Sequence, residues 1–119
     1  MFPFWYHECM SLTNKKCKSC EDKNAKALSM EEIADLLMEV PGWGLSPDGD
    51  MISREFSFSS FDNAISFVSD IAKVAEGEGH HPDIHVFYDK VRLDIKTHSI
   101  GALTENDFIL AAKVDAIVR

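Results

Sequence analysis

The stretch Glu76-Gly77-Glu78-Gly79-His80-His81-Pro82-Asp83 separates a helical pattern from a strand pattern, and it holds two adjacent histidines. Glycine enters left-handed backbone conformations without a steric penalty, so Gly77 and Gly79 predict the end of the preceding helix, at Gly77. Pro82 prevents a helix from continuing and favours an extended backbone at His81. We therefore expect a constrained turn, a place where rigid scaffolds often carry function. A pair of solvated loop histidines is the alternative interpretation.

Downstream of this turn, alternating apolar and polar residues predict a β-hairpin. Residues 84–88 form the first predicted strand and residues 91–98 the second, because side chains of a strand alternate between its two faces. The first strand would carry Ile84, Val86 and Tyr88 on one face, with Asp89-Lys90 as the turn. The same period places His98 on the polar face of the second strand, where a lone histidine is usually just solvated.

The last helix is predicted at residues 105–117 by the capping box Thr104-Glu105-Asn106-Asp107. The local interpretation of Asp107 is therefore a helix cap. This helix is apolar around most of its circumference, so it needs more cover than one face of a sheet provides. We expect it to contribute to a subunit interface.

Upstream, residues 61–76 carry the clearest amphipathic helical pattern of the chain. Its predicted buried face consists of Phe61, Ala64, Ile65, Val68, Ile71, Ala72 and Ala75. A first helix at about residues 30–39 begins with a capping box at Ser29. The segment at Trp43 and a strand at 51–58 flank an Asp48-Gly49 turn, which predicts a second hairpin. The favoured local interpretation of Trp43 is a core aromatic residue.

The elements are thus expected in the order α-β-β-α-β-β-α. Two local hairpins predict an antiparallel four-stranded sheet with helices packed on one face, an α+β fold. The 119 residues suggest one domain, at residues 29–119, preceded by a poorly structured extension at residues 1–28.

Composition narrows the classes of function. The net charge of -8 argues against a general nucleic-acid binder, which needs a basic surface. The sequence has no apolar run long enough to span a bilayer and no recognisable signal peptide, so we expect a cytoplasmic protein. The cysteines Cys9, Cys17 and Cys20 all lie in the extension, and with His7 they form a weak zinc-site pattern. A flexible tail is the favoured interpretation of that segment.

Taken together, several motifs give the chain a family resemblance across about residues 29–118. They are Glu76, His80-His81-Pro82-Asp83, Tyr88-x-x-Val91, Thr97-His98 and Gly101-x-Leu103-Thr104-x-x-Asp107, with Trp43 and Phe56-x-Phe58 in agreement. In this combination the chain resembles the pterin-4a-carbinolamine dehydratase family. It departs from the family at Gly101-Ala102, where a second glycine is common, which affects the shape of the loop beside the site.

The resemblance implies a hydro-lyase that dehydrates 4a-hydroxytetrahydropterin to quinonoid dihydropterin, in tetrahydrobiopterin recycling after aromatic amino acid hydroxylation. It implies no metal and no cofactor. The catalytic residues carried over are His80, His81 and His98, by histidine acid–base catalysis. The substrate-binding residues carried over are Trp43, Glu76, Pro82, Asp83, Thr97 and Asp107. The implied assembly is a homotetramer built from dimers, or a homodimer, with a functional link to an aromatic amino acid hydroxylase.

Two other functions remain open. Relatives of this fold also act as dimerisation cofactors of a transcription factor, so a non-catalytic cofactor or a pterin-binding module is the first alternative. The second is a metal site formed by His80, His81 and His98. Adjacent histidines on an extended segment point in different directions, so one metal ion would rarely bind both.

Overall fold

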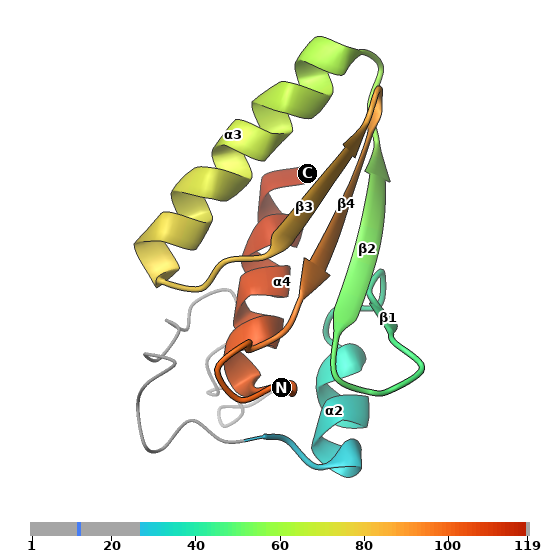
Figure 1. The fold of residues 1–119 in the computed structure, drawn as a ribbon. Helices are drawn as coiled ribbons and strands as arrows, with labels where there is room; N and C mark the ends of the chain where they lie inside the picture. The colour runs from blue at the N-terminus through green and yellow to red at the C-terminus, as the bar shows by residue number, and fades with distance from the viewer. Residues whose placement is uncertain (1–11, 13–26, 119) are drawn as a thin grey trace, which may run out of the picture.

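The computed structural model describes residue 12 and residues 27–118 (Figure 1). The predicted zinc pattern of His7, Cys9, Cys17 and Cys20 lies outside the described residues, as does most of the predicted extension. The elements are α2 (Met30–Leu37), β1 (Gly44–Leu45), β2 (Ile52–Ser57), α3 (Phe61–Glu78), β3 (Asp83–Phe87), β4 (Lys90–Ile95) and α4 (Glu105–Val118). Their order confirms the predicted α-β-β-α-β-β-α arrangement.

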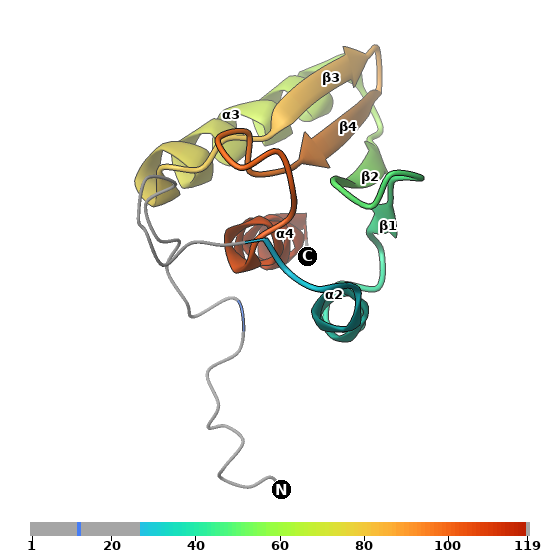
Figure 2. The ribbon, with the colours of Figure 1, turned by 60° about the horizontal axis from the view of Figure 1, so that its bottom comes forward.

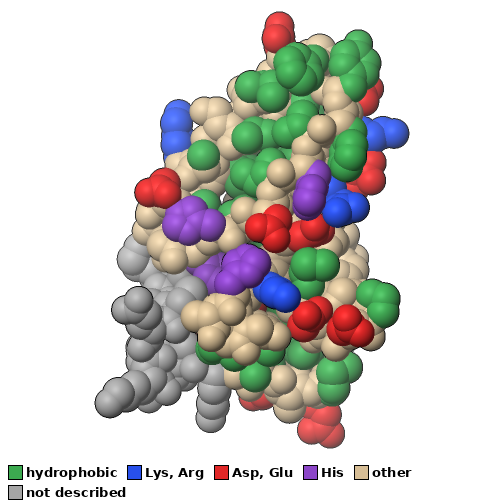
Figure 3. Space-filling view, in the orientation of Figure 1, with side chains coloured by type: hydrophobic (Ala, Val, Ile, Leu, Met, Phe, Trp, Pro, Cys, Tyr) green, Lys and Arg blue, Asp and Glu red, His purple; other side chains and the backbone are tan. Residues whose placement is uncertain are grey.

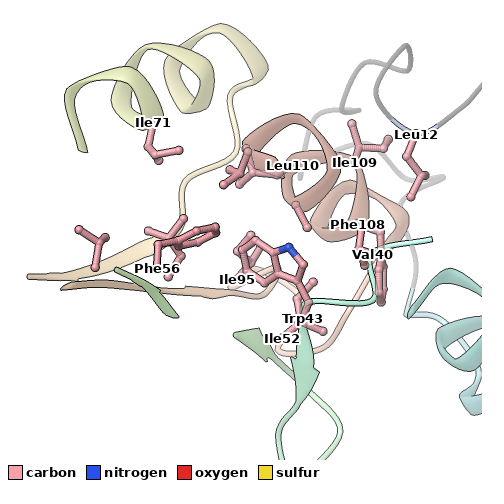
Figure 4. Close-up of a cluster of buried hydrophobic side chains, with 14 of the residues drawn as sticks. Leu12, Val40, Trp43, Ile52, Phe56, Ile71, Ile95, Phe108, Ile109 and Leu110 are labelled. Carbon is pink, nitrogen blue, oxygen red and sulfur yellow. The ribbon is translucent and has the colours of Figure 1, made fainter. Parts of the chain in front are cut away.

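The four strands form one antiparallel sheet in the order β1-β2-β4-β3. α3 and α4 cover one face of this sheet, and α2 lies near the N-terminal end of α4 (Figures 1 and 2). The core between these layers contains Ile52, Phe56 and Ile95 from the strands, with Ile71 from α3 and Leu110 from α4 (Figure 4). Both predicted hairpins are present, so the α+β prediction is confirmed. None of the helices in the described segment is both long and apolar enough to cross a membrane.

The N-terminus of α2 is fixed by the capping box that the sequence predicts. The Glu32 backbone N–H donates to Ser29 Oγ at 3.1 Å, and the Ser29 backbone N–H donates to Glu32 Oε1 at 2.8 Å. These bonds satisfy two backbone donors that a helix start otherwise leaves without partners, which stabilises a helix by about 1 kcal/mol. The helix ends at Leu37, two residues before the predicted boundary at residue 39.

The C-terminus of α3 corrects the prediction from the two glycines. The helix continues through Gly77 and ends at Glu78, and Gly79 is the left-handed cap with φ 67°. A glycine inside a helix costs about 1 kcal/mol relative to alanine, which a long packed helix tolerates. Only the left-handed position requires glycine. The helix is therefore two residues longer than predicted, and the two histidines come immediately after its cap, Gly79.

The buried face of α3 is narrower than predicted. Ala64, Phe67, Ile71 and Ala75 are buried. Phe61 and Ile65, which the pattern placed on the buried face, keep 48% and 42% of their surface exposed. The sheet and α4 thus cover only one stripe of α3, and apolar side chains remain on the flank of the helix.

The hairpin of β3 and β4 turns one residue earlier than predicted. Phe87 and Lys90 are paired, so the turn residues are Tyr88 and Asp89 rather than Asp89 and Lys90. Tyr88 has a φ of 56°, a left-handed conformation that is uncommon outside glycine. It is exposed and lies outside the strand, so it does not share a strand face with Ile84 and Val86 as predicted.

The face of the sheet opposite the helices carries a cluster of polar side chains around Asp94, which is almost fully buried. Ser53 Oγ donates to Asp94 Oδ1 at 2.6 Å, while His85 Nε2 and Arg92 reach Asp94 Oδ2 at 2.9 and 3.2 Å. Burial alone would raise the pKa of Asp94, but the hydrogen bonds from Ser53, His85 and Arg92 outweigh it and lower the pKa. This cluster ties β2, β4 and β3 together.

α4 is the most buried helix of the described part of the chain, with Phe108, Ile109, Leu110 and Val114 in the core. Part of its cover comes from the N-terminal part of the same chain, because Leu12 is buried beside Ile109 (Figure 4). The expected subunit interface on α4 stays a prediction.

Candidate active site

His80 is the first residue after the cap of α3, and the fold turns it inward. Its backbone N–H donates to the Ala75 carbonyl at 3.2 Å, and its side chain is only 3% exposed. Its Nε2 lies 2.6 Å from Oδ1 of Asp107, whose side chain is fully buried at 0% exposure. When Asp107 is ionised its carboxylate only accepts hydrogen bonds, and Nε2 is then the donor in this pair.

Asp107 is held in place by the start of α4 and by the strand extension that follows β4. Its Oδ2 accepts hydrogen bonds from the Thr104 backbone N–H at 2.8 Å and from Thr97 Oγ1 at 3.0 Å. Thr97 and Thr104 also share a hydrogen bond of 2.8 Å between their hydroxyl groups. The aspartate therefore caps the helix, as the local interpretation expects, and it also orients His80. Both carboxylate oxygens of this buried side chain therefore have hydrogen-bond partners.

His81 points the other way, towards solvent. Its Nε2 lies 2.8 Å from Glu76 Oε2, and the side chains are 58% and 79% exposed, respectively. Both residues come from the C-terminal end of α3 and the turn after it. The opposite directions of His80 and His81 are what an extended backbone before Pro82 produces.

His98 comes from the polar side of the strand extension, where the period of two places it. It is largely exposed, and its Nε2 lies 3.8 Å from Oδ1 of Asp83 at the start of β3. That distance is too long for a hydrogen bond but short enough for an ion pair when the imidazole is protonated. Each of the three histidines thus has a carboxylate beside it.

The three histidines line one cavity of about 250 Å³, together with Gly79, Lys96 and Ser99. The space-filling view shows histidine side chains gathered on one face of the molecule, with acidic side chains among them (Figure 3). Residues 18 positions apart in the sequence meet here, because the turn after α3 lies against the segment after β4. Imidazole can donate or accept a proton near neutral pH, so the cavity is suited to acid–base chemistry.

All but one of the other residues predicted for substrate binding lie near the histidines. Glu76, Asp83 and Asp107 each contact one of the histidines, and Thr97 contacts Asp107. Pro82 is half-buried beside them.

Trp43 does not line the histidine cavity. It is buried in the core, and its indole N–H donates to Asp115 Oδ1 on α4 at 3.0 Å. The same oxygen accepts a bond of 2.8 Å from Arg54 on β2. This position agrees with the local interpretation of Trp43 as a core aromatic residue.

Sequence reasoning missed Lys96 and Ser99, which also line the cavity. The period of two was a usable signal for Lys96, because it puts this side chain on the same face as His98. His85 was not assigned either, and it belongs to the Asp94 cluster. Across residues 27–118 no group of three or more His, Cys, Asp or Glu side chains is arranged to hold a metal ion.

Comparisons with known proteins agree on one family. The sequence model described as pterin 4 alpha carbinolamine dehydratase matches residues 26–117. The chain is 47% identical over 108 residues to a putative pterin-4-alpha-carbinolamine dehydratase of Halorhodospira halophila, covering 91% of this chain and 98% of that protein. It is 44% identical over 109 residues to pterin-4-alpha-carbinolamine dehydratase 2, mitochondrial, of Arabidopsis thaliana, covering 89% of this chain but only 58% of the plant protein.

Solved structures show the same fold. A transcriptional coactivator/pterin dehydratase from Brucella melitensis superposes with a TM-score of 0.75 at 32% identity, covering 79% of this chain and 100% of that chain. A pterin dehydratase-like protein described as a RuBisCO assembly factor in the alpha-carboxysome superposes with a TM-score of 0.55 at 26% identity. The match covers 64% of this chain and 88% of that chain.

Proposed function

The chain belongs to the pterin 4 alpha carbinolamine dehydratase family of hydro-lyases, and we propose that it removes water from a 4a-hydroxytetrahydropterin. The product is the quinonoid dihydropterin. One observation carries the proposal: a single cavity brings together three histidines, each with a carboxylate beside it.

The reaction needs one proton donor and one proton acceptor. The C4a–O bond breaks, and the hydroxyl leaves as water with a proton from the acid. A base takes the proton from N5, and the electrons of that N–H bond form the C4a=N5 double bond. No electron leaves the substrate. Imidazole serves both roles, because its unperturbed pKa of about 6.5 keeps both protonation states populated near neutral pH.

We assign His80 and His98 as the acid and base that flank the C4a hydroxyl and N5, with His81 orienting the pterin. The buried Asp107 supports this role for His80, because a carboxylate hydrogen-bonded to imidazole fixes the orientation of the ring. Glu76 and Asp83 lie beside the two exposed histidines and orient them more weakly, because these side chains are largely surrounded by water.

The proposed setting is the recycling of tetrahydrobiopterin after aromatic amino acid hydroxylation, with a hydroxylase as the functional partner. The proposed compartment is the cytoplasm, although the Arabidopsis relative carries "mitochondrial" in its name. The proposed assembly is a homodimer or a homotetramer built from dimers. Analytical ultracentrifugation at micromolar concentration tests it, and a monomer would contradict it.

The test of the activity is a coupled assay in which a hydroxylase generates the 4a-hydroxytetrahydropterin. We expect the protein to accelerate dehydration, and a folded His81→Ala variant to lose most of that acceleration. A folded, wild-type oligomer that gives no acceleration would overturn the proposal.

A second candidate is a protein-binding role, which the Brucella relative's description as a transcriptional coactivator favours. Phe61 and Ile65 on the flank of α3 supply an exposed apolar surface for such contact. This role predicts that Phe61→Ser and Ile65→Ser remove a cellular phenotype of the protein while leaving the dehydration rate unchanged. If only substitutions of the cavity histidines remove the phenotype, the binding role is wrong.

A further inference from the structure

Lys96 is the cationic side chain in the wall of the histidine cavity. It follows directly after β4, and the period of two puts it on the same side of the chain as His98, about 7 Å along the backbone. Its side chain is 30% exposed, so part of it lies against protein and part faces the cavity and solvent.

The position of Lys96 is set by Asp50, which lies in the segment between β1 and β2. Lys96 Nζ lies 3.4 Å from Asp50 Oδ2. Asp50 is itself held by Ser46, whose hydroxyl donates to Asp50 Oδ1 at 2.9 Å and accepts from the Asp50 backbone N–H at 3.3 Å. The hydrogen bond from Ser46 lowers the pKa of Asp50, so its carboxylate is charged at neutral pH.

The chemistry of the ammonium group limits what it can bind in the cavity. An ammonium has three hydrogen-bond donors and no acceptor, and the contact with Asp50 uses one of them. Lys96 can therefore hold only an acceptor atom of the substrate. A pterin ring carries one carbonyl, the 4-oxo group, which is two bonds from C4a and is purely an acceptor.

We infer that Lys96 is a substrate-binding residue that donates a hydrogen bond to the 4-oxo oxygen of the pterin, held in place by the Asp50–Ser46 pair. The inference deepens the proposed dehydratase function and rests on it. With Lys96 on the carbonyl, the neighbouring His98 lies beside C4a and N5, the atoms where protons move.

The bond to Lys96 acts on binding rather than on the chemical step. Positive charge develops at N5 as the hydroxyl leaves, and an ammonium on the 4-oxo oxygen, the neighbour of N5 across C4a, cannot stabilise that positive charge. Asp50 offsets the charge of Lys96, so the pair is nearly neutral towards the ring. A contact that is equal in the ground state and the transition state changes KM and leaves kcat unchanged.

The experiment compares Lys96→Met and Lys96→Arg with the control variant Lys90→Met, which removes a lysine at the exposed start of the same strand. Each protein is assayed with two 4a-hydroxytetrahydropterins, one with a 6-methyl group and one with a dihydroxypropyl side chain. We expect Lys96→Met to raise KM about 10-fold for both substrates with kcat within about 2-fold, since it removes a hydrogen bond from a charged donor. Lys96→Arg should restore most of the affinity, and Lys90→Met should match the wild type.

Three results would overturn the inference. The first is a wild-type KM in Lys96→Met. The second is a rise in KM for the dihydroxypropyl substrate alone, which would mean that Lys96 binds the side chain. The third is a fall in kcat with KM unchanged.

A binding titration separates this inference from the proposed function. If the wild type gives no dehydration, the proposed function fails, and the affinity for fluorescent 6-methylpterin still tests Lys96. Weaker binding by Lys96→Met than by Lys90→Met would then support the contact, and equal or absent binding would refute it. A double-mutant cycle with Asp50→Asn adds a further check, because Asp50→Asn should have little additional effect once Lys96 is replaced.

Discussion

The pairs His80–Asp107 and His81–Glu76 each join an imidazole to a carboxylate, and the two histidines are adjacent in the chain, yet the pairs occupy different physical environments. In the first pair both partners are almost completely buried, and Asp107 has two further donors. In the second pair both partners are largely exposed to water. Removing one partner of a buried charged pair leaves an uncompensated group inside the protein, whereas an exposed pair contributes little because water screens it. The comparison teaches that a change in the first pair should lower both the stability and the proposed activity. A change in the second pair should leave the stability almost unaffected.

The largest effect is expected from Asp107→Asn, which breaks the buried pair while keeping the side-chain shape. We expect the free energy of unfolding to fall by about 3 kcal/mol, because the buried hydrogen bonds lose their charged acceptor. We also expect kcat to fall about 100-fold or more, because His80 loses the carboxylate that orients it. Urea unfolding and the coupled assay measure the two effects. A stable, fully active Asp107→Asn protein would show that burial of this pair has no role.

His98→Ala should lower kcat by about 100-fold while changing the free energy of unfolding by less than about 0.5 kcal/mol. The reason is that His98 is exposed and its carboxylate, Asp83, remains in water when the imidazole is removed. The matched control is His85→Ala, which removes a histidine of the Asp94 cluster from the same sheet and should keep the turnover. Equal losses of turnover in the two variants would contradict the placement of the site.

Asp94 lies between these extremes, because a nearly buried carboxylate pairs with a half-exposed histidine. The pKa of Asp94 is lower in the folded protein than the unfolded value of about 3.9. The unfolded state therefore binds more protons in acid, and the stabilising contribution of Asp94 is full above pH 4 and is lost as the pH falls through the folded pKa. We expect Asp94→Asn to cost about 1 kcal/mol at pH 7 and progressively less as the pH falls below about 4, in urea unfolding across that range. A cost that does not change with pH would contradict this.

The smallest effect is expected from Glu76→Gln. Its partner His81 and the carboxylate itself are both exposed, so the free energy of unfolding should change by less than about 0.5 kcal/mol. Any effect on kcat/KM should shrink further when the salt concentration rises from 0.01 to about 0.15 M, because the Debye length falls to about 8 Å. A loss as large as that of Asp107→Asn would mean that exposure does not distinguish the two pairs.

Much of the fold could be predicted from local signals in the sequence. The capping box at Ser29, the alternation in the two hairpins and the apolar stripe of α3 each depend on residues close together in the chain. Phe61 and Ile65 are exposed although the pattern placed them on the buried face, and the errors in element boundaries are shifts of one or two residues. Gly77 and Gly79 both resemble a helix end, and only the packing of α3 selects the second. At the hairpin, Tyr88 takes the left-handed position that the pattern did not assign to it.

The Asp94 cluster and the assembly of the cavity could not be predicted, because they depend on which strands pair and on how the loops pack. Asp94 is buried because Ser53 stands beside it on β2 and His85 approaches from β3, and the sequence does not state the order β1-β2-β4-β3. Lys96 lines the cavity only because the turn after α3 lies against the segment after β4. The three histidines were proposed as site residues through the family resemblance, since the pattern of residues alone left them open to a solvated interpretation.

The link between His80 and Asp107 spans 27 residues of the chain and crosses the whole of the second hairpin. The pair forms only after α4 has docked with its first turn against the end of α3. A chain that has built its helices and hairpins separately therefore lacks the complete histidine cavity. Recovery of turnover after dilution from denaturant should consequently lag behind the recovery of secondary structure and coincide with the final packing of the core. The activity would then report the last step of refolding.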